Sequence, residues 1–271
     1  MATKYAFIGG GNMGQALISG LINSKKSTLS NIRVADPSET TRNYCEHHLG
    51  VKTCENNQEA IAGADVVIFA VKPQDMNSVI SALTIEDAST LLFISIAAGV
   101  RLNRLRELLG ENQAIVRCMP NTPALVHSGI SALIATDNTS AQQRSQAGNL
   151  LDSVGKSIWI EDEALMDAVT AVSGSGPAYF FLLIELIQKA GIKLGLPSDL
   201  SQTLAIETAF GSAKLALQSP DTPSTLRQKV TSPQGTTDAA LNVFSSSGLE
   251  DIVNRAITAA HDRSIALSKE N

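Results

Sequence analysis

Several residue types are scarce in this chain of 271 residues, and each scarcity excludes a class of protein. The three cysteines are scattered and form no C-x-x-C pair, so we expect no disulfide framework. The four histidines lack metal-site spacing to cysteines or acids, so we expect no bound metal. A formal net charge of −5 leaves no basic footprint for a nucleic-acid partner.

Long uninterrupted apolar runs are also missing. The run YFFLLIELI at 179–187 is shorter than the roughly 18 apolar residues of a membrane span and contains Glu185. The first residues have neither the basic and apolar regions of a signal peptide nor the arginine-rich pattern of a transit peptide. We therefore expect a soluble, cytoplasmic protein without a membrane partner.

The chain itself has two textures. Up to about residue 161, short apolar runs alternate with helical patterns, and the runs at 65–71 and 90–97 are continuously apolar, as in strands buried on both faces. Strands are also expected at 4–9, 31–36, 51–56, 114–120, 129–136 and 157–160. This alternation predicts an α/β fold with a Rossmann-type, doubly wound, mostly parallel sheet. Residues 162–271 contain only helical patterns. The predicted domains are therefore 1–161, which binds a dinucleotide, and an all-α domain at 162–271.

The second helix of the all-α domain is apolar around most of its circumference. Between residues 178 and 194 its charged and amide side chains form one narrow stripe: Glu185, Gln188, Lys189 and Lys193. Such a helix has to be covered on nearly all sides. We expect a partner subunit, most simply in a two-fold homodimer; a central helix in a monomer is the alternative.

The segment FIGGGNMG at 7–14 contains a G-x-G-x-x-G pattern directly after the first strand. Gly9 permits a tight turn, Gly11 lets a pyrophosphate approach the backbone, and Gly14 allows close packing of helix and strand. The amide groups at the helix start favour an anion. The pattern predicts dinucleotide binding, with a purely structural glycine-rich turn as the alternative.

Asp36 ends the second strand about 20 residues beyond the glycines, where an acid contacts the ribose of NAD. However, Ser38 and Arg42 follow, and such side chains bind the 2′-phosphate of NADP. The sequence is therefore ambivalent between NADH and NADPH. Alternatively, Asp36 and Ser38 only cap the next helix.

Three further strand ends carry residues suited to a ligand, which in open α/β sheets lies outside the carboxyl ends of the strands. In AVKPQ (70–74), Lys72 is a candidate for contact with ribose or phosphate, with a lone surface lysine as the alternative. SIAAGV (95–100) places small residues after its strand. In RCMPNTPALV (117–126), Asn121 lies between two prolines and suits the nicotinamide carboxamide, with a structural turn as the alternative. The expected cofactor residues are Ile8, Gly9, Gly11, Asn12, Met13, Gly14, Asp36, Ser38, Asn57, Ala70, Val71, Lys72, Pro73, Ala97, Ala98 and Asn121.

These motifs, together with AVSGSGPAYFF (171–181) and TSPQGTTDAAL (231–241), stand in the order seen in pyrroline-5-carboxylate reductases, which this chain resembles over nearly its whole length. The resemblance implies reduction of the cyclic imine Δ1-pyrroline-5-carboxylate to L-proline, the last step of proline biosynthesis, with NADPH or NADH. It also implies a Rossmann domain followed by a helical dimerisation domain, with a decameric ring of dimers as a larger assembly.

The segment at 230–240 suits this small substrate, because a helix that begins at Gly-Thr-Thr offers free amides to a carboxylate. The resemblance implies that Thr237 is the catalytic residue and orients the amine nitrogen. The expected substrate residues are Ser175, Ser232, Gly235, Thr236 and Thr237.

Two positions depart from the family pattern. Gln234 stands where the family usually has glycine, and this substitution is costly if the position has positive φ. Asp36 stands where a neutral Ser or Asn is common, which weakens the expectation of NADPH. The alternatives are another imine or β-hydroxyacid reductase and a non-catalytic NAD(P)-binding regulator. A β-hydroxyacid reductase carries a catalytic lysine on the long interdomain helix, and here Lys189 and Lys193 lie far from the start of that helix, which argues against this alternative.

Overall fold

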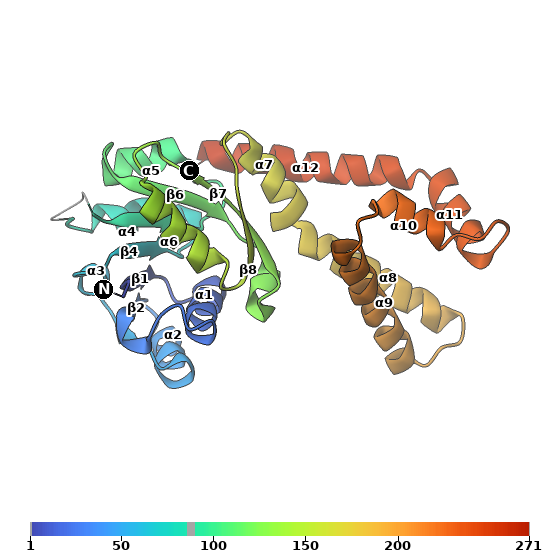
Figure 1. Cartoon of the computed structure of the whole chain (residues 1–271), viewed down its shortest axis with the longest axis horizontal. Helices are drawn as coiled ribbons and strands as arrows, with labels where there is room; N and C mark the ends of the chain where they lie inside the picture. The colour runs from blue at the N-terminus through green and yellow to red at the C-terminus, as the bar shows by residue number, and fades with distance from the viewer. Residues whose placement is uncertain (1, 86–89, 271) are drawn as a thin grey trace. The chain divides into compact units, whose positions relative to one another are not determined.

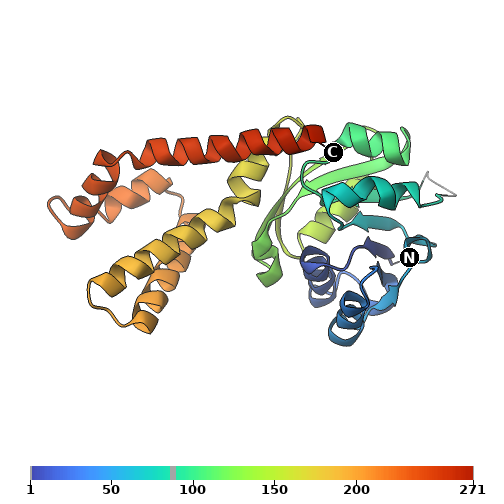
Figure 2. The ribbon, with the colours of Figure 1, turned by 180° about the vertical axis from the view of Figure 1, so that it is seen from behind.

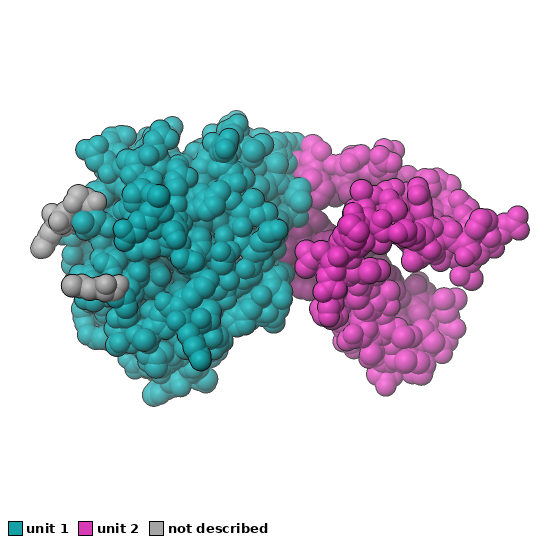
Figure 3. Space-filling view, viewed as in Figure 1, with its two compact units in different colours: residues 1–175, 260–271 teal, residues 176–259 magenta. Residues whose placement is uncertain are grey.

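The computed structural model describes residues 2–85 and 90–270. The chain forms two compact units (Figure 3). Unit 1 contains residues 1–175 and 260–271, and unit 2 contains residues 176–259. The domain boundary predicted between residues 161 and 162 falls inside unit 1 and stays a prediction.

Unit 1 is built on an eight-stranded sheet with the order β3-β2-β1-β4-β5-β6-β7-β8. The strands are β1 Tyr5–Ile8, β2 Ile32–Ala35, β3 Lys52–Cys54, β4 Val66–Phe69, β5 Leu92–Ser95, β6 Ala114–Met119, β7 Gly129–Ala135 and β8 Gly155–Trp159. Neighbouring strands are parallel except for the antiparallel pair β6 and β7. The order 3-2-1-4-5-6 of the first six strands is that of a Rossmann sheet. The predicted α/β class, the strands and the mostly parallel pairing are confirmed.

Helices cover both faces of this sheet (Figures 1 and 2). One apolar core lies beneath α1 and α6 and the other beneath α3, α4 and α5. The helices of unit 1 are α1 Asn12–Asn23, α2 Glu39–Tyr44, α3 Asn57–Ile61, α4 Met76–Ser81, α5 Leu102–Leu109, α6 Ala141–Leu151 and α7 Leu165–Val169. All four residues of β4 are buried, which explains the continuously apolar sequence there.

Unit 2 is helical throughout its described residues. Its helices are α8 Gly176–Lys193, α9 Ser198–Gln218, α10 Pro223–Lys229, α11 Thr236–Ser246 and the first part of α12 Leu249–Glu270. Helices α8 and α9 pack closely at Gly191, where an added Cβ would lie 2.3 Å from the Ser201 Oγ. The Ser201 hydroxyl donates a hydrogen bond to the Gln188 carbonyl at 2.8 Å. The predicted all-α domain is therefore present.

Helix α8 leaves most of its apolar surface uncovered within the chain. Phe180 and Phe181 are each 64% exposed, and Leu186 and Ile187 are also exposed. The segment Leu165–Lys193 is long and apolar enough to cross a membrane, which differs from the expectation drawn from uninterrupted apolar runs. The reason is that isolated charges such as Glu185 break a run without greatly lowering the mean hydropathy. An exposed apolar helix also fits the predicted partner subunit.

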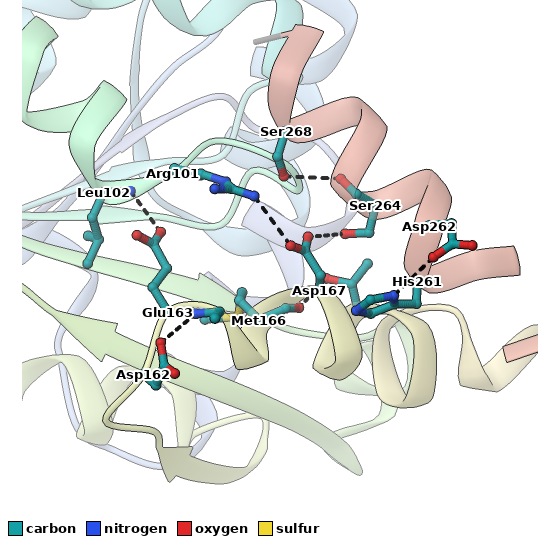
Figure 4. Close-up of polar contacts among 12 residues, drawn as sticks. Arg101, Leu102, Asp162, Glu163, Met166, Asp167, His261, Asp262, Ser264 and Ser268 are labelled. Carbon is teal, nitrogen blue, oxygen red and sulfur yellow. Dashed lines mark hydrogen bonds and ion pairs between the residues drawn. The ribbon is translucent and has the colours of Figure 1, made fainter. Parts of the chain in front are cut away.

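A buried polar network joins the end of the chain to unit 1 (Figure 4). Asp167 on α7 is buried, accepts a hydrogen bond from the Ser264 hydroxyl at 2.7 Å and lies 3.6 Å from the Arg101 guanidinium. Nearby, one oxygen of Glu163 accepts hydrogen bonds from the buried Arg117 guanidinium and from the Leu102 amide, at 2.6 and 2.8 Å. The bond from Ser264 to Asp167 ties residues 260–271 to the rest of unit 1.

Candidate active site

The glycine-rich turn after β1 has the geometry of a dinucleotide cradle. Gly9 has φ +102°, and a Cβ there would lie 2.5 Å from the Ala70 carbonyl oxygen, so only glycine fits. A Cβ at Gly14 would lie 2.8 Å from the Gly9 oxygen. At Gly11, by contrast, no neighbouring atom lies within 4 Å of a Cβ position, so the backbone faces open space. A diphosphate fits here because α1 begins at Asn12 and, in the described part of the chain, no side chain caps it.

The Asp36 carboxylate holds this turn from the end of β2. Its Oδ2 accepts a hydrogen bond from the Gly10 amide at 2.8 Å, and its Oδ1 accepts one from the Ser38 amide at 2.9 Å. The Ser38 hydroxyl accepts from the Thr41 amide and caps α2, as the capping alternative proposed. Both carboxylate oxygens of Asp36 therefore have protein donors.

Arg42 lies beside Asp36 and is held in place. Its Nη1 donates to the carbonyl oxygens of Asp36 and Pro37 at 2.9 and 3.0 Å, and its Nη2 donates to Glu55 at 2.7 Å. The guanidinium thus places a positive charge where a 2′-phosphate would bind after β2. The arrangement combines the acid of NAD sites with a cation that suits NADP, so the ambivalence of the sequence persists in three dimensions.

A pocket of about 240 Å³ lies at the carboxyl ends of the central strands. It is lined by Met13, Ala70, Val71, Lys72, Ile96, Met119 and Pro120. The first four were predicted cofactor residues. The sequence analysis missed Ile96, Met119 and Pro120, although each stands at or just after the end of a buried strand. The pocket is at the edge of the sheet where open α/β proteins bind their ligands.

The remaining predicted cofactor residues lie along the same edge of the sheet. Ile8 ends β1, and Ala97 and Ala98 follow β5. Pro73 begins a short 3₁₀ turn, and Asn57 is the first residue of α3. Contacts of these residues with a cofactor stay predictions.

Asn121 has protein partners for both ends of its side chain. Its Nδ2 donates to the Ser173 carbonyl at 3.1 Å, and its Oδ1 accepts from the Ile130 amide at 2.9 Å. This matches the structural alternative for the residue. A direct contact with the nicotinamide stays a prediction.

The predicted substrate segment in unit 2 forms a tight turn before α11. Gln234 has φ +59°, so this position does require the left-handed conformation that favours glycine. Its amide donates to Asp238 Oδ2 at 3.0 Å, and the Gly235 amide donates to the Ser232 carbonyl at 2.9 Å.

Gly235 is the N-cap residue of α11. No side chain among the described residues caps this helix, so its first-turn amides are left for water or a ligand. Thr237 is half-buried on this turn. Ser175 is the last residue of its stretch of unit 1, and its amide donates to the Thr170 carbonyl at 2.8 Å. The roles of these residues stay predictions.

The cysteines do not contribute a nucleophile to this edge. Burial, and secondarily the charge of Asp36, raises the pKa of the Cys45 thiol to about 11. Burial also raises the pKa of the Cys118 thiol. Among the described residues no cluster of His, Cys, Asp and Glu could hold a metal ion. The site therefore offers backbone amides, hydroxyls and apolar walls.

Known proteins identify this arrangement. A family model described as pyrroline-5-carboxylate reductase dimerisation matches residues 163–267, and one described as NADP oxidoreductase, coenzyme F420-dependent, matches residues 4–99. The chain is 46% identical to a pyrroline-5-carboxylate reductase of Pseudomonas aeruginosa, over 98% of this chain and 97% of that one. The chain belongs to the pyrroline-5-carboxylate reductase family.

Solved structures of this family share the whole fold. A pyrroline-5-carboxylate reductase from Coxiella burnetii has a TM-score of 0.92 at 36% identity, covering 99% of each chain. A Plasmodium falciparum pyrroline carboxylate reductase with NADP bound has a TM-score of 0.88 at 31% identity, covering 98% of each chain. The dimerisation model covers α8, so the exposed apolar side chains of this helix lie in the part of the chain that supports self-association. Nothing in these comparisons supports a β-hydroxyacid reductase or a non-catalytic regulator.

Proposed function

We propose that this chain reduces Δ1-pyrroline-5-carboxylate to L-proline, with the cofactor held by unit 1 and the substrate carboxylate held by the start of α11. It is an oxidoreductase that uses NAD(P)H and acts in proline biosynthesis, as its family membership shows. The observation that carries the assignment of residues is the open glycine turn at Gly9 and Gly11, next to the pocket at the carboxyl ends of the strands.

The cofactor is bound by unit 1. The amides at the start of α1 bind the diphosphate, and Lys72 and Arg42 face the ribose and phosphate groups. Met13, Val71 and Met119 form apolar walls around the nicotinamide in the 240 Å³ pocket. When bound, NAD(P)H supplies the hydride.

The substrate is bound by the turn at 232–237. The Thr236 amide and the Ser232 hydroxyl donate to the substrate carboxylate, which lies close to the Gly235 backbone and which the helix dipole also stabilises. Ser175 supplies a further hydroxyl. The negative charge of the substrate and its small size match a site that is made of amides rather than of a charged side chain.

Thr237 orients the ring nitrogen. The substrate reacts as its protonated iminium: the hydride adds to the ring carbon, the C=N π electrons move to nitrogen, and the nitrogen keeps the proton it already carried. The Thr237 hydroxyl accepts a hydrogen bond from that N–H. No strong general base is required. Most of the rate then comes from holding the donor and acceptor carbons about 3–3.5 Å apart.

The enzyme acts as a homo-oligomer. Its dimerisation domain supports self-association, and the proposal extends this to a dimer as the basic unit, a decameric ring as the larger assembly and a cytoplasmic location. Nucleic acid and membrane are not among its partners.

The direct test follows the absorbance of reduced cofactor at 340 nm with Δ1-pyrroline-5-carboxylate, separately for NADPH and NADH. Formation of L-proline, identified by chromatography, in proportion to cofactor oxidation is expected. Cofactor binding without turnover of either cofactor would contradict the assigned reaction and favour the regulator.

A further inference from the structure

Asn121 is a buried amide at the edge of the pocket, and it joins three elements. It follows β6 directly after Pro120 and is 9% exposed. Its side chain bonds to the carbonyl of Ser173, at the junction between α7 and α8, and to the amide of Ile130 on β7. All of these groups belong to unit 1.

The Ser173 carbonyl needs a donor because of a proline. In a regular α-helix this carbonyl would accept from the amide of residue 177, but Pro177 has no N–H. The chain there forms a π-helical turn, η5 Thr170–Gly174, closed by the bond from the Ser175 amide to the Thr170 carbonyl at 2.8 Å. Such turns concentrate at functional sites. The Asn121 amide supplies a donor in place of the one that Pro177 lacks.

The turn that Asn121 holds, Thr170–Gly174, packs against Met119, which lines the pocket. A Cβ at Gly174 would lie 2.3 Å from the Cε of Met119, so the Gly174 backbone packs directly against that side chain. Met119 and Pro120 both line the 240 Å³ pocket. Loosening the bond to Ser173 would free Gly174, and with it the end of the Met119 side chain.

We infer that Asn121 is a positioning residue for hydride transfer: by holding Ser173 and Gly174 against Met119, it fixes the apolar wall that orients the nicotinamide. This role rests on the proposed function, which places the nicotinamide in this pocket. It differs from a direct contact between Asn121 and the carboxamide, because the effect passes through Met119.

Asn121→Asp isolates the relevant bond, because aspartate keeps an acceptor for the Ile130 amide but has no donor for the Ser173 carbonyl. The matched control is Asn138→Asp. Asn138 also donates to backbone carbonyls, those of Asn112 and Gln113 at 2.6 and 3.0 Å, and it does not line the pocket. Circular dichroism melting curves report the stability of both variants.

The readouts are kcat with NADPH, and calorimetric binding of NADP⁺ and of 2′-phospho-ADP-ribose, which lacks the nicotinamide. Asn121→Asp is expected to lower kcat about tenfold or more and to weaken NADP⁺ binding, while 2′-phospho-ADP-ribose binds as in the wild type. Asn138→Asp is expected to leave kcat and both affinities unchanged. If both variants retain wild-type kcat and NADP⁺ affinity, or if Asn121→Asp weakens both ligands equally, the inference is wrong.

A second-site change tests the assigned bond. Pro177→Ala restores the N–H that donates to the Ser173 carbonyl in a regular α-helix, so the double variant with Asn121→Asp should recover part of the lost kcat. Absence of recovery would contradict the explanation through Ser173. Failure of the proposed function is distinguishable, since the wild-type enzyme would then not turn over Δ1-pyrroline-5-carboxylate, whereas the comparison of the two ligands does not depend on turnover.

Discussion

The carboxylate of Asp36 accepts a hydrogen bond from the amide of Gly10, with 2.8 Å between Oδ2 and the nitrogen. The acid that sequence reasoning assigns to the cofactor ribose therefore also fixes the turn that receives the diphosphate. A bond between a carboxylate and an amide is worth about 1.5–3 kcal/mol. In the proposed function, Asp36 would therefore contribute to cofactor binding whichever cofactor is used.

We expect Asp36→Asn to raise the KM for NADPH and NADH by similar factors, about five- to tenfold. The reason is that the Gly10 and Ser38 amides donate to two different oxygens of Asp36, and asparagine replaces one of these oxygens with an NH2 group that cannot accept. Steady-state kinetics with each cofactor check this. Glu39→Gln, which removes the charge of an exposed neighbour, should leave both KM values near wild type. A loss confined to NADH would show instead that Asp36 acts only on the ribose.

The second prediction concerns the hydroxyl of Thr237. Thr237→Ala should lower kcat/KM for Δ1-pyrroline-5-carboxylate roughly ten- to a hundredfold, which corresponds to the ~1.5–3 kcal/mol of one hydrogen bond to a charged group. Thr237→Ser, which keeps the hydroxyl, should lose far less. Thr236→Ala is the matched control, because Thr236 is assigned a role through its backbone amide. Equal effects at the two threonines would remove the special role of Thr237.

The strained residue of the substrate turn gives a stability prediction. Left-handed backbone costs about 1–2 kcal/mol at a residue other than glycine, and Gln234 has φ +59°. Gln234→Gly should therefore raise the free energy of unfolding by about 0.5 kcal/mol, after the greater chain entropy of glycine is counted. Denaturant unfolding measures this. Gln228→Gly, in the last turn of α10, should instead lower stability, by less than the ~1 kcal/mol that glycine costs in a helix interior. A stability loss at Gln234 would mean that its side chain contributes more than its backbone costs.

The exposed face of α8 gives a prediction about assembly. Phe181→Asp places a charge at a phenylalanine that is 64% exposed in the single chain and that we expect the partner subunit to cover. Light scattering after size exclusion should find a multiple of the 28.6 kDa chain mass for the wild type and a shift toward that mass for the variant. Lys189→Gln, on the polar stripe of α8, should keep the oligomer. An unchanged mass for Phe181→Asp would place the interface elsewhere.

Much of this molecule was predictable because its signals are local. The strands show as short apolar runs, and Gly9 and Gly14 stand where any side chain would collide with backbone. The cost expected at Gln234 was also predictable from local sequence, because glycine is usual at this position in the family and glycine favours positive φ.

Other features could not be read from local sequence. The pocket residues Ile96 and Met119 come from different strands, and only the sheet order brings them together. The bond from Asn121 to Ser173 joins residues 52 positions apart. The sequence of α12 predicts a single continuous helix and gives no sign that its end belongs to a different unit from its beginning. Ser264, near that end, contacts a buried carboxylate of α7 in unit 1.

That contact has a consequence for how the protein is made. Asp167 is synthesised almost a hundred residues before Ser264, whose hydroxyl donates the buried hydrogen bond to its carboxylate. During translation its carboxylate therefore has to remain hydrated, or rely on Arg101 alone, until Ser264 has left the ribosome. Residues 1–175 of unit 1 can fold early, but the Asp167 carboxylate is covered only after α12 has been synthesised. A chain that ended before Ser264 would keep the glycine-rich turn after β1 and the turn at 232–237, but its Asp167 carboxylate would lack the Ser264 hydroxyl.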